Sequence, residues 1–595
     1  MNSQLGFNMK KIVVGLLVFI LLLAAVVLSV GYYYLRGATP ALPPLQLFIH
    51  GQILTMDNSN RVVSAMAVRG ERIEALGSND EILALRQAGT VVYDLKGKTL
   101  LPGFIDAHGH FPGTGLSAVG SDLSSPPLGA VRSISDIQQY LAEAAKTGKD
   151  EDWLFGFGYD DSLLLEKRHP NRHDLDAVST TRPIYLMHSS GHLAVVNTAG
   201  LRRAGINAET SDPEGGVIVR EDNSTQPSGL LLEHATDLVA AQAMDFSGLD
   251  FLAMVDAARD QYLAAGVTTI QSGGVDSRLL NGLYWLSKLQ RIPQRVLVWP
   301  LADKVEAELN SGALSLDDFQ SDTFAASAIK IIVDGSIQGY TAFLSEPYYQ
   351  QQTGSTDPAY RGFSRYKQDE LNAQVKNLHC KNYQLALHGN GDAAIDMVLT
   401  AIEYAQQACP RADARPILVH GQMARADQIT RMKQQGITPS FFSAHTYFWG
   451  DRHRDQFLGP ERGARISPLA EAVAEDLRFT VHLDSPVVPM DMARLLWTSV
   501  TRQTRSGEVL GADQRINTLQ ALRAVTIDAA WQSFKEQDIG SLEVGKFADL
   551  VLLDRSPLAS EDNLLNFKVD QVWIAGRCYF QRGRNECDVI SNESR

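Results

Sequence analysis

Short apolar runs recur through the middle of the chain, and most of them end in a histidine, lysine or aspartate. Helical stretches separate these runs, which read RPIYLMHSSGH, VTTIQSGG, RVLVWPL, AIKIIVDGS, YQLALHGNGD, RPILVHGQ, ITPSFFSAH and FTVHLDSPV. The alternation predicts parallel strands joined by crossover helices, and a (β/α)₈ barrel is the simplest closed arrangement. The carboxyl ends of barrel strands meet at one face. We therefore expect the polar residues at these ends to form one site.

Histidines at three of these positions favour a metal. His108 and His110 follow the apolar segment LLPGFID with one residue between them, so on an extended chain both imidazoles point to one side. His388 and His420 end two further runs. Any one of them alone could be a buried, hydrogen-bonded side chain. Four imidazoles at one barrel mouth instead favour borderline-soft divalent cations, with zinc first.

Lys330 and Asp484 extend this pattern. Lys330 lies inside an apolar run, where burying an unpaired ammonium is expensive. Its amine could react with carbon dioxide to give a carbamate that bridges two metals, or it could form an ion pair with Asp334, and spacing leaves both open. Asp484 ends another run and could bind metal and accept a proton, or cap a turn. His482, two residues earlier, is expected to contact substrate or to support Asp484.

The N-terminus predicts a membrane anchor. Residues 12–35 contain no charge and follow Lys10 and Lys11, so they can span a bilayer core of about 30 Å with the N-terminus in the cytoplasm. An uncleaved helix is our interpretation, with a cleaved signal peptide as the alternative. The remaining chain is then expected on the extracytoplasmic, periplasmic side of the cell membrane.

Composition limits the partners. The formal net charge of -14 and the pI near 5.5 argue against nucleic acid. The four cysteines lack CxxC spacing; Cys578 and Cys587 could pair across a hairpin or remain thiols. Nothing in the sequence indicates an oligomeric state.

Short β-like segments at both ends of the chain predict a small sheet domain that the two ends share. The predicted organisation is a cytoplasmic segment (1–11), an anchor (12–35), a linker (36–44), the first part of a β-sandwich (45–98), a barrel (99–535) and the second part of the sandwich (536–595).

The ordered motifs LLPGFIDAHGH, SSGHLAVVNTAGL, EGGVIVRED, KIIVDGSIQG, LHGNGDAAID, ILVHGQ, LDSPV and GSLEVGKFADLVLLD resemble those of the amidohydrolase superfamily, and within it the YtcJ-like branch, amidohydrolase family 3. The resemblance covers nearly the whole chain after the anchor. It implies a distorted (β/α)₈ TIM barrel with a small β-sandwich formed by both chain ends. It also implies hydrolysis of carbon–nitrogen bonds in small amide-type substrates with one or two metal ions.

The resemblance also implies roles for individual residues. His192 would steady the substrate carbonyl or the leaving group, unless it is a structural histidine, and His445 is a similar candidate. His482 departs from the family pattern, which has a small residue there, so the shape of the substrate pocket is in doubt. The implied metal ligands are His108 and His110 for a buried ion, His388 and His420 for a more exposed ion, carbamylated Lys330 as the bridge, and Asp484.

The resulting hypothesis is a two-zinc amidohydrolase in which metal-held hydroxide attacks an amide-like carbon and Asp484 passes the proton to the departing nitrogen. Two alternatives remain. One is a deaminase with a single metal, which has no need of a bridging carbamate at Lys330. The other is a membrane-tethered regulatory or binding protein without turnover, against which the intact set of candidate ligands argues.

Overall fold

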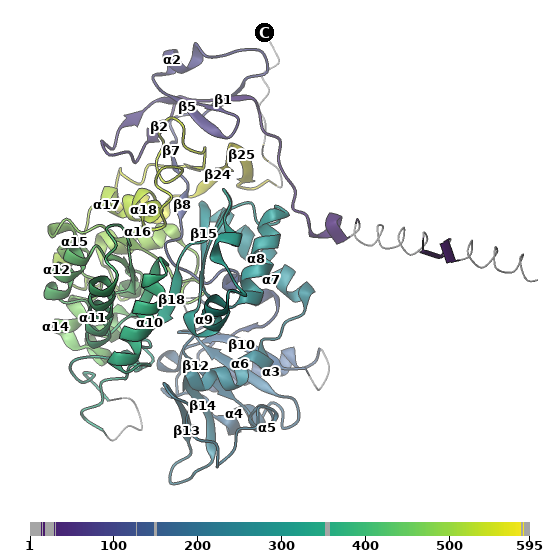
Figure 1. Cartoon of the computed structure of the whole chain (residues 1–595), viewed down its shortest axis with the longest axis vertical. Coiled ribbons are helices and arrows are strands. Elements are labelled where there is room, and N and C mark those ends of the chain that lie inside the picture. The colour runs from purple at the N-terminus through teal and green to yellow at the C-terminus, as the bar shows by residue number, and fades with distance from the viewer. Residues whose placement is uncertain are drawn as a thin grey trace, which may run out of the picture.

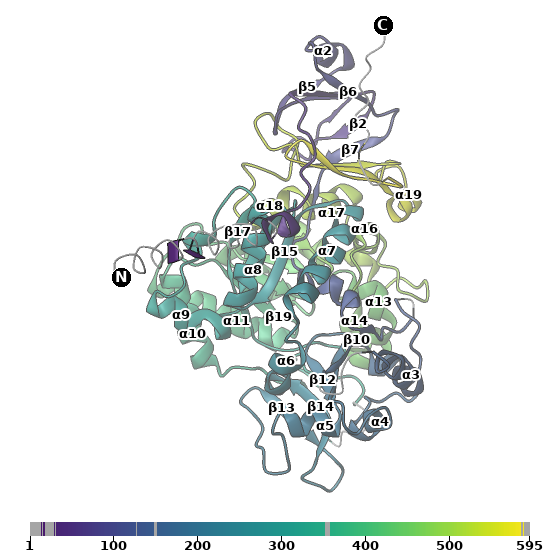
Figure 2. The ribbon, with the colours of Figure 1, turned by 90° about the vertical axis from the view of Figure 1, so that its right-hand side faces the viewer.

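The computed structural model describes residues 13–14, 16–17, 29, 31–126, 128–147, 152–351, 357–584 and 587. Three layers follow one another along the long axis of the molecule (Figure 1). The sheets built from the two chain ends lie at the top, the parallel strands with their helices in the middle, and a separate sheet with short helices at the bottom. The same order appears after a quarter turn (Figure 2).

The middle layer contains two parallel sheets among the described residues. Their strands are almost entirely buried, which is why they read as continuous apolar runs. The first sheet has the order β17 (Phe324–Ala326), β16 (Arg295–Pro300), β15 (Val267–Val275) and β8 (Phe104–Ile105). The second has the order β18 (Ile329–Ile332), β19 (Leu385–Gly389), β20 (Ile417–His420), β21 (Thr438–Phe441) and β22 (Thr480–Val481).

The two parallel sheets adjoin at both margins. An isolated parallel bridge joins Leu301, just after β16, to Lys330 in β18. At the other margin, the backbone N–H of Asp484 donates to the carbonyl of His108 at 3.3 Å. The carboxyl ends of strands from both sheets are thereby brought together.

Helices cover the parallel strands. Several begin with a side chain that accepts the orphan N–H groups of the first turn, as Ser247 does for Asp250 at the start of α7. The principal helices of this layer are α7 (Gly248–Ala264), α8 (Ser277–Lys288), α9 (Ala302–Ser311), α10 (Gln368–Cys380), α11 (Asp392–Ala408), α12 (Ala426–Gln435), α13 (His445–Arg452), α14 (Gly459–Ala464), α15 (Leu469–Ala474), α16 (Met492–Thr501), α17 (Thr518–Ala524) and α18 (Ile527–Gln532).

The bottom layer corrects one assignment made from sequence. The run RPIYLMHSSGH, expected among the barrel strands, forms β11 of a separate mixed sheet, while the short β8 joins the parallel set instead. The order of this sheet is β13 (Gly216–Arg220), β14 (Pro227–Glu233), β12 (Leu193–Val196), β11 (Ile184–His188), β10 (Leu154–Tyr159) and β9 (Ser121–Asp122). Its helices are α3 (Ile134–Ala144), α4 (Arg172–Asp176), α5 (Thr198–Arg203) and α6 (Asp237–Ala243).

The top layer is built from both chain ends, and its two sheets share an aromatic core in which the ring of Trp573 meets Phe48 and Tyr93 edge-on. The predicted boundary at residue 98 falls just before β7, which pairs with β23. One sheet contains β5 (Arg72–Gly77), β4 (Ala65–Arg69), β1 (Leu45–Ile49) and β6 (Val91–Asp94). The other contains β25 (Arg577–Gln581), β24 (Val569–Ile574), β23 (Leu550–Leu553), β7 (Thr99–Pro102), β2 (Gln52–Leu54) and β3 (Val62–Val63), and this layer also carries α2 (Asn79–Leu83) and α19 (Glu561–Asn566).

All four cysteines form disulfides. Cys578 and Cys587 are joined, which was one of the two alternatives left open by their spacing. Cys380, at the end of α10, is joined to Cys409, directly after α11, a pairing that the sequence did not indicate.

The predicted anchor falls largely outside the described residues. Within the ranges that the structure describes, no single helix is both long and apolar enough to cross a membrane. A bent pair, His234–Ala243 with Gly248–Ala264, meets the length and composition requirement only when its two helices are taken together.

Candidate metal centre

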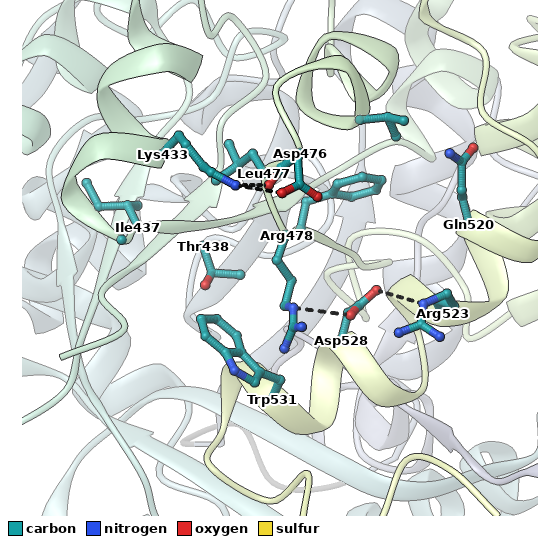
Figure 3. A pocket seen from close by; sticks show the side chains of 13 residues that line it. Lys433, Ile437, Thr438, Asp476, Leu477, Arg478, Gln520, Arg523, Asp528 and Trp531 are labelled. Carbon is teal, nitrogen blue, oxygen red and sulfur yellow. Dashed lines mark hydrogen bonds and ion pairs between the residues drawn. The ribbon is translucent and has the colours of Figure 1, made fainter. Parts of the chain in front are cut away.

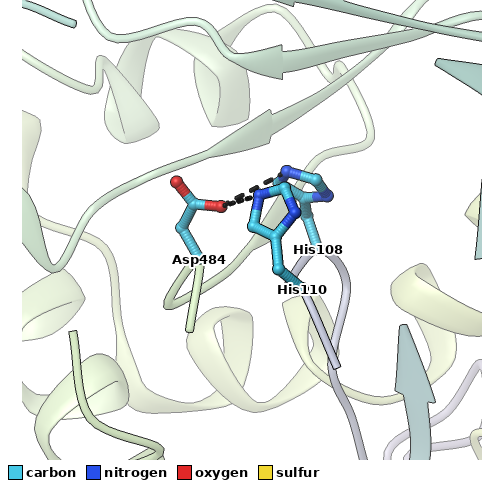
Figure 4. Close-up of side chains that lie close together, drawn as sticks. All are labelled: His108, His110 and Asp484. Carbon is cyan, nitrogen blue, oxygen red and sulfur yellow. Dashed lines mark ion pairs between the residues drawn. The ribbon is translucent and has the colours of Figure 1, made fainter. Parts of the chain in front are cut away.

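Two histidines and an aspartate from opposite margins of the parallel strands converge on one point (Figure 4). His108 and His110 follow β8, and Asp484 follows β22. The Nε2 atoms of His108 and His110 lie 3.3 and 3.1 Å from Oδ1 of Asp484. These separations match the distance of about 3.4 Å between neighbouring ligands of a tetrahedral zinc ion.

The other nitrogen of each of these two rings faces an acceptor. His108 Nδ1 lies 3.0 Å from Oε1 of Gln271, an oxygen that also accepts the backbone N–H of Gly109. His110 Nδ1 lies 2.8 Å from the carbonyl of Gly273. In the neutral imidazoles the proton therefore sits on Nδ1, and Nε2 turns a lone pair toward the centre.

The centre therefore needs a positive charge. Two lone pairs face a carboxylate oxygen that has no hydrogen-bond donor in the structure. Burial holds the pKa of His108 well below its ordinary value, so protonation of that ring does not supply the charge. A cation held between the three side chains would satisfy all of them. The donor set thus fits a divalent metal.

His388 approaches from β19 and has a carboxylate behind it. Its Nδ1 lies 3.1 Å from Oδ1 of Asp334. Oδ1 also accepts the backbone N–H of Asn390, and Oδ2 accepts those of Gly391 and Phe343. Asp334 had been considered as an ion-pair partner of Lys330; it instead orients His388. A carboxylate behind a histidine fixes the ring and raises its basicity as a metal ligand.

His420 ends β20 and is supported by a second histidine. Its Nδ1 lies 3.1 Å from Nε2 of His482, whose Nδ1 lies 2.8 Å from the hydroxyl of Ser440. The Nε2 atom of His420 points inward, 4.0 Å from Oδ2 of Asp484. His482 is buried with both ring nitrogens engaged, and it lies behind His420. Its contact with a substrate stays a prediction.

Lys330 completes the group from β18. Its Nζ lies 3.2 Å from Nε2 of His108, and the side chain is fully buried. Burial lowers the pKa of Lys330 to about 7, against which the charge of Asp484 acts in the raising direction. A substantial fraction of neutral amine is therefore present near neutral pH.

The backbone is strained at two of these positions. His420 has φ 75° and Asp484 has φ 56°, in the left-handed region that residues with a side chain rarely adopt. Such conformations cost of order 1–3 kcal/mol and persist where the surroundings impose them, often at functional sites. Here both strained residues direct a ligand atom into the centre.

Burial also lowers the pKa values of the other inward-facing imidazoles. The pKa values of His388 and His420 lie well below the ordinary value, chiefly through desolvation and secondarily through neighbouring histidines. Burial lowers the pKa of His482 to about 3. Neutral imidazole is the form that binds a metal.

The mixed sheet contributes His192 to the edge of the centre. It lies in the turn before β12, with its ring centroid 5.2 Å from that of His388. Its Nδ1 lies 2.8 Å from Oε2 of Glu233, a buried residue at the end of β14. Burial alone would lower the pKa of His192, but Glu233 raises it above its ordinary value.

His445 lies one layer further out. It begins α13, and its ring stacks on Trp449 and meets Phe442 at 4.4 Å. Its Nδ1 lies 2.8 Å from Nε2 of His453. Contact with a substrate therefore stays a prediction for His445, whose ring is buried among aromatic side chains.

A second group of the same residue types lies between the mixed sheet and α13. Asp160, Asp161 and His188 offer ligand atoms at a comparable spacing. The difference is on His188 Nδ1, which accepts the backbone N–H of Ser190 at 3.1 Å. The neutral ring then carries its proton on Nε2, 3.2 Å from Oδ1 of Asp161, so a donor already faces an acceptor.

Asp160 in this second group has its own cation. Arg452 Nη1 lies 3.2 Å from its carboxylate, and Trp449 Nε1 donates at 2.9 Å. The group, which we call the Asp160–His188 cluster, consists of Asp160, Asp161, His188 and Arg452. His188 Nε2 and Asp161 Oδ1 make no hydrogen bond of full geometry, but the cluster already holds a donor facing Asp161 and a cation facing Asp160, and it joins the mixed sheet to α13.

A cavity of about 490 Å³ lies away from the centre (Figure 3). Its lining includes Thr438, the first residue of β21, and Phe479, which precedes β22. These positions are at the amino ends of the strands, whereas the centre is at their carboxyl ends. Figure 3 shows Asp528 between Arg478 and Arg523, an arrangement unrelated to the metal ligands.

Sequence reasoning missed the residues that orient the rings. Gln271 and Glu233 carry no motif spacing relative to the histidines, and Gly273 acts through its carbonyl. One weak signal existed, since Glu233 ends the alternating strand PSGLLLE with a charged residue. Asp334 was noted but assigned a different partner.

Comparison with known proteins agrees with this arrangement. A model of the amidohydrolase family matches residues 91–580, which is most of the chain. The chain belongs to the amidohydrolase family. The family prediction made from the motifs is confirmed.

Two relatives align over most of their length. An N-substituted formamide deformylase from Arthrobacter pascens is 28% identical over 90% of this chain and 98% of its own. A protein of Bacillus subtilis (strain 168) named as an amidohydrolase, YtcJ, is 25% identical over 89% and 98%. With the family membership, these relatives identify the chain as a hydrolase of carbon–nitrogen bonds other than peptide bonds.

The fold also resembles a solved structure. An uncharacterized metal-dependent hydrolase from Pyrococcus horikoshii OT3 superimposes with a TM-score of 0.69 at 24% identity, covering 87% of this chain and 99% of the other. The mixed α/β architecture is therefore that of the amidohydrolases.

Proposed function

We propose that the protein hydrolyses an amide-type bond in a small molecule with two zinc ions at the described centre. The observation that carries this proposal is the orientation of the rings. In His108, His110, His388 and His420, Nδ1 contacts an outer residue, which leaves Nε2 as the acceptor nitrogen. That atom also lies 3.2 Å from Lys330 Nζ in His108 and 3.3 Å from Asn390 Nδ2 in His388. Supporting this, the relative from Arthrobacter pascens is named for a formamide substrate, so N-formyl amines are the first compounds to test.

The proposed ligands follow from position. His108 and His110 would hold the buried ion with Asp484, and His388 and His420 the second ion. Lys330, as a carbamate, would bridge the two, and its lowered pKa favours the neutral amine that reacts with carbon dioxide. We propose further that the two parallel sheets act as one distorted (β/α)₈ barrel whose carboxyl ends carry all of these groups.

In the proposed mechanism, a bound divalent metal lowers the pKa of water and polarises a carbonyl oxygen. Asp484 accepts the proton that is released and returns it to the departing nitrogen. The buried position of Asp484 excludes bulk water from that transfer. His192, at the edge of the centre, steadies the carbonyl oxygen or the leaving group through Nε2.

We propose an extracytoplasmic location, with residues 12–35 as a single-pass anchor. Two disulfides support it, because disulfides persist in oxidising compartments and are rare in the cytosol.

The test is the metal content of the full chain purified in detergent, with Lys330→Ala and the surface variant Lys304→Ala as a matched control. We expect roughly two zinc ions per chain in the wild type and the control, and fewer in Lys330→Ala. An intact mass that includes one carbon dioxide would support the carbamate. Protein that stays without metal and without N-formyl amine hydrolysis after zinc addition would contradict the proposal and favour a tethered binding protein.

A further inference from the structure

The mixed sheet holds a carboxylate directly behind His192. Strands β12 and β14 pair antiparallel with Leu193 opposite Leu232, so His192 and Glu233 face each other at the adjoining position. The backbone N–H of Glu233 donates to the carbonyl of His192 at 2.8 Å, and the side chains meet at 2.8 Å between Nδ1 and Oε2. The two residues are thus joined twice.

The surrounding backbone holds Glu233 in place. Glu233 has φ 52°, in the left-handed region, and the Thr236 hydroxyl donates to its carbonyl at 2.8 Å. A Cβ at Gly335 would lie 2.1 Å from Oε1 of Glu233, so only glycine leaves room there. Gly335 follows Asp334, so the carboxylate of Glu233 lies beside the loop that orients His388.

The geometry leaves one nitrogen of His192 available. The side chain of Glu233 is 1% exposed, whereas that of His192 is 16% exposed, so the ring covers the carboxylate from the open side. Since Nδ1 is engaged by Glu233, Nε2 is the nitrogen that remains for a substrate. The arrangement parallels Asp334 behind His388, except that His388 is a proposed metal ligand.

We propose that Glu233 is a positioning residue of the hydrolase: it fixes the His192 imidazole so that Nε2 faces the substrate bound at the metal centre. This inference rests on the proposed function. It adds a second carboxylate–imidazole pair to the site and assigns the mixed sheet a part in the reaction. A carboxylate in this position holds the ring in one orientation and one tautomer.

The test compares Glu233→Gln, Glu233→Asp and His192→Ala with the double variant Glu233→Gln/His192→Ala, all as the full chain. Loss of an orienting partner typically costs 10- to 100-fold, so we expect kcat for an N-formyl amine to fall by about that factor in Glu233→Gln. In the His192→Ala background the same change should cost nothing more, because the ring it orients is gone. A normal kcat in both Glu233 variants, or losses that multiply in the double variant, would overturn the proposal.

A matched control and a direct readout complete the design. The same layer carries a second histidine–glutamate pair, in which His173 Nε2 of α4 lies 2.8 Å from Oε1 of Glu221, just after β13. Glu221→Gln should leave kcat unchanged. Crystal structures of the wild type and Glu233→Gln report the His192 ring independently of activity. A displaced ring in the variant supports the assignment, and an unmoved ring refutes it, even if no amide proves to be a substrate.

Discussion

Two buried clusters in this protein use the same residue types and differ in where the imidazole protons sit. In the metal centre, Gln271 and the Gly273 carbonyl accept from Nδ1, so Nε2 is an acceptor that faces another acceptor, Asp484. In the Asp160–His188 cluster, a backbone N–H donates to Nδ1 of His188, so Nε2 is a donor that faces Asp161. The first cluster sets acceptors against an acceptor and so calls for a cation, whereas the second already contains a donor and the cation of Arg452. The partner on the outer nitrogen makes the difference.

The largest difference is expected when the aspartate of each cluster is neutralised. Asp484→Asn should lower turnover by roughly 10²- to 10⁴-fold, the usual contribution of a general acid and base, while much of the metal stays bound. Asp161→Asn should leave turnover little changed. Kinetics on metal-analysed protein check both; near-normal turnover in metal-loaded Asp484→Asn would reject its role.

The free energy of unfolding should respond most strongly to changes in the Asp160–His188 cluster. Asp160→Ala leaves the partly buried guanidinium of Arg452 without its carboxylate, and removing one partner of a buried pair typically costs about 3–5 kcal/mol. Asp245→Ala breaks an exposed pair with Arg278 and should cost about 0–1 kcal/mol. Urea unfolding measures both free energies. Equal values would show that the Asp160–His188 cluster does not hold the mixed sheet to α13.

Metal affinity should separate the clusters through their outer partners. Asp334→Asn should weaken zinc binding by about 10- to 100-fold, because Asp334 orients His388. Ser190→Ala removes the hydroxyl that lies 2.9 Å from Nδ1 of His188 and should leave zinc affinity unchanged. Competition with a chelator gives both values. A loss of zinc in Ser190→Ala would place a metal in the second cluster.

The smallest effect, per pH unit, is the acid sensitivity of stability, and it separates Asp160 from His453, a neighbour of His445 that lies outside both clusters. Burial lowers the folded-state pKa of His453 to about 3, so the unfolded chain binds more protons below about pH 6.5. The resulting stability is complete above that pH and is lost as pH falls toward 3, by about 1.4 kcal/mol per unit for each such histidine. Burial acts to raise the pKa of Asp160, but the charge of Arg452 and other neighbours lower it below the ordinary value. The stability that Asp160 contributes is therefore present above pH 3.8 and is lost only below that pH.

Unfolding of metal-free protein between pH 3 and pH 8 tests this prediction. A single loss confined to pH below 3.8 would show that the buried histidines are not neutral partners. His453→Gln should lower the slope of the upper part of the profile by the share of one histidine and leave the lower part unchanged.

The convergence of the candidate ligands was predictable from sequence because each lies in or just after an apolar strand. Parallel strands bring their carboxyl ends together whatever the loops do, so His108 meets Asp484 although hundreds of residues separate them, and His388 adjoins His420. The same rule misplaced His188, which also ends an apolar strand, because nothing in that run shows which sheet it joins. Its neighbour His192 reaches the centre only because β12 turns back antiparallel.

The orienting residues were not predictable for a different reason. A histidine needs an acceptor on its outer nitrogen, and an amide, a carbonyl, a carboxylate or another histidine all serve. The requirement is therefore met by geometry and leaves no fixed residue type in the sequence. His482, which was expected to contact substrate or to support Asp484, is one of these partners, for His420.

The strand β7 ties the two ends of the chain to the chemistry. It pairs with β23 in the upper layer, and after Gly103 the chain continues into β8 and the turn that carries His108. The strands near the C-terminus thus support the segment that carries His108 and His110, the first candidate ligands in the chain. An exchange or truncation of the C-terminal segment would therefore disturb the candidate ligands that follow β8, so the two parts of the upper layer have to be changed together when the protein is engineered.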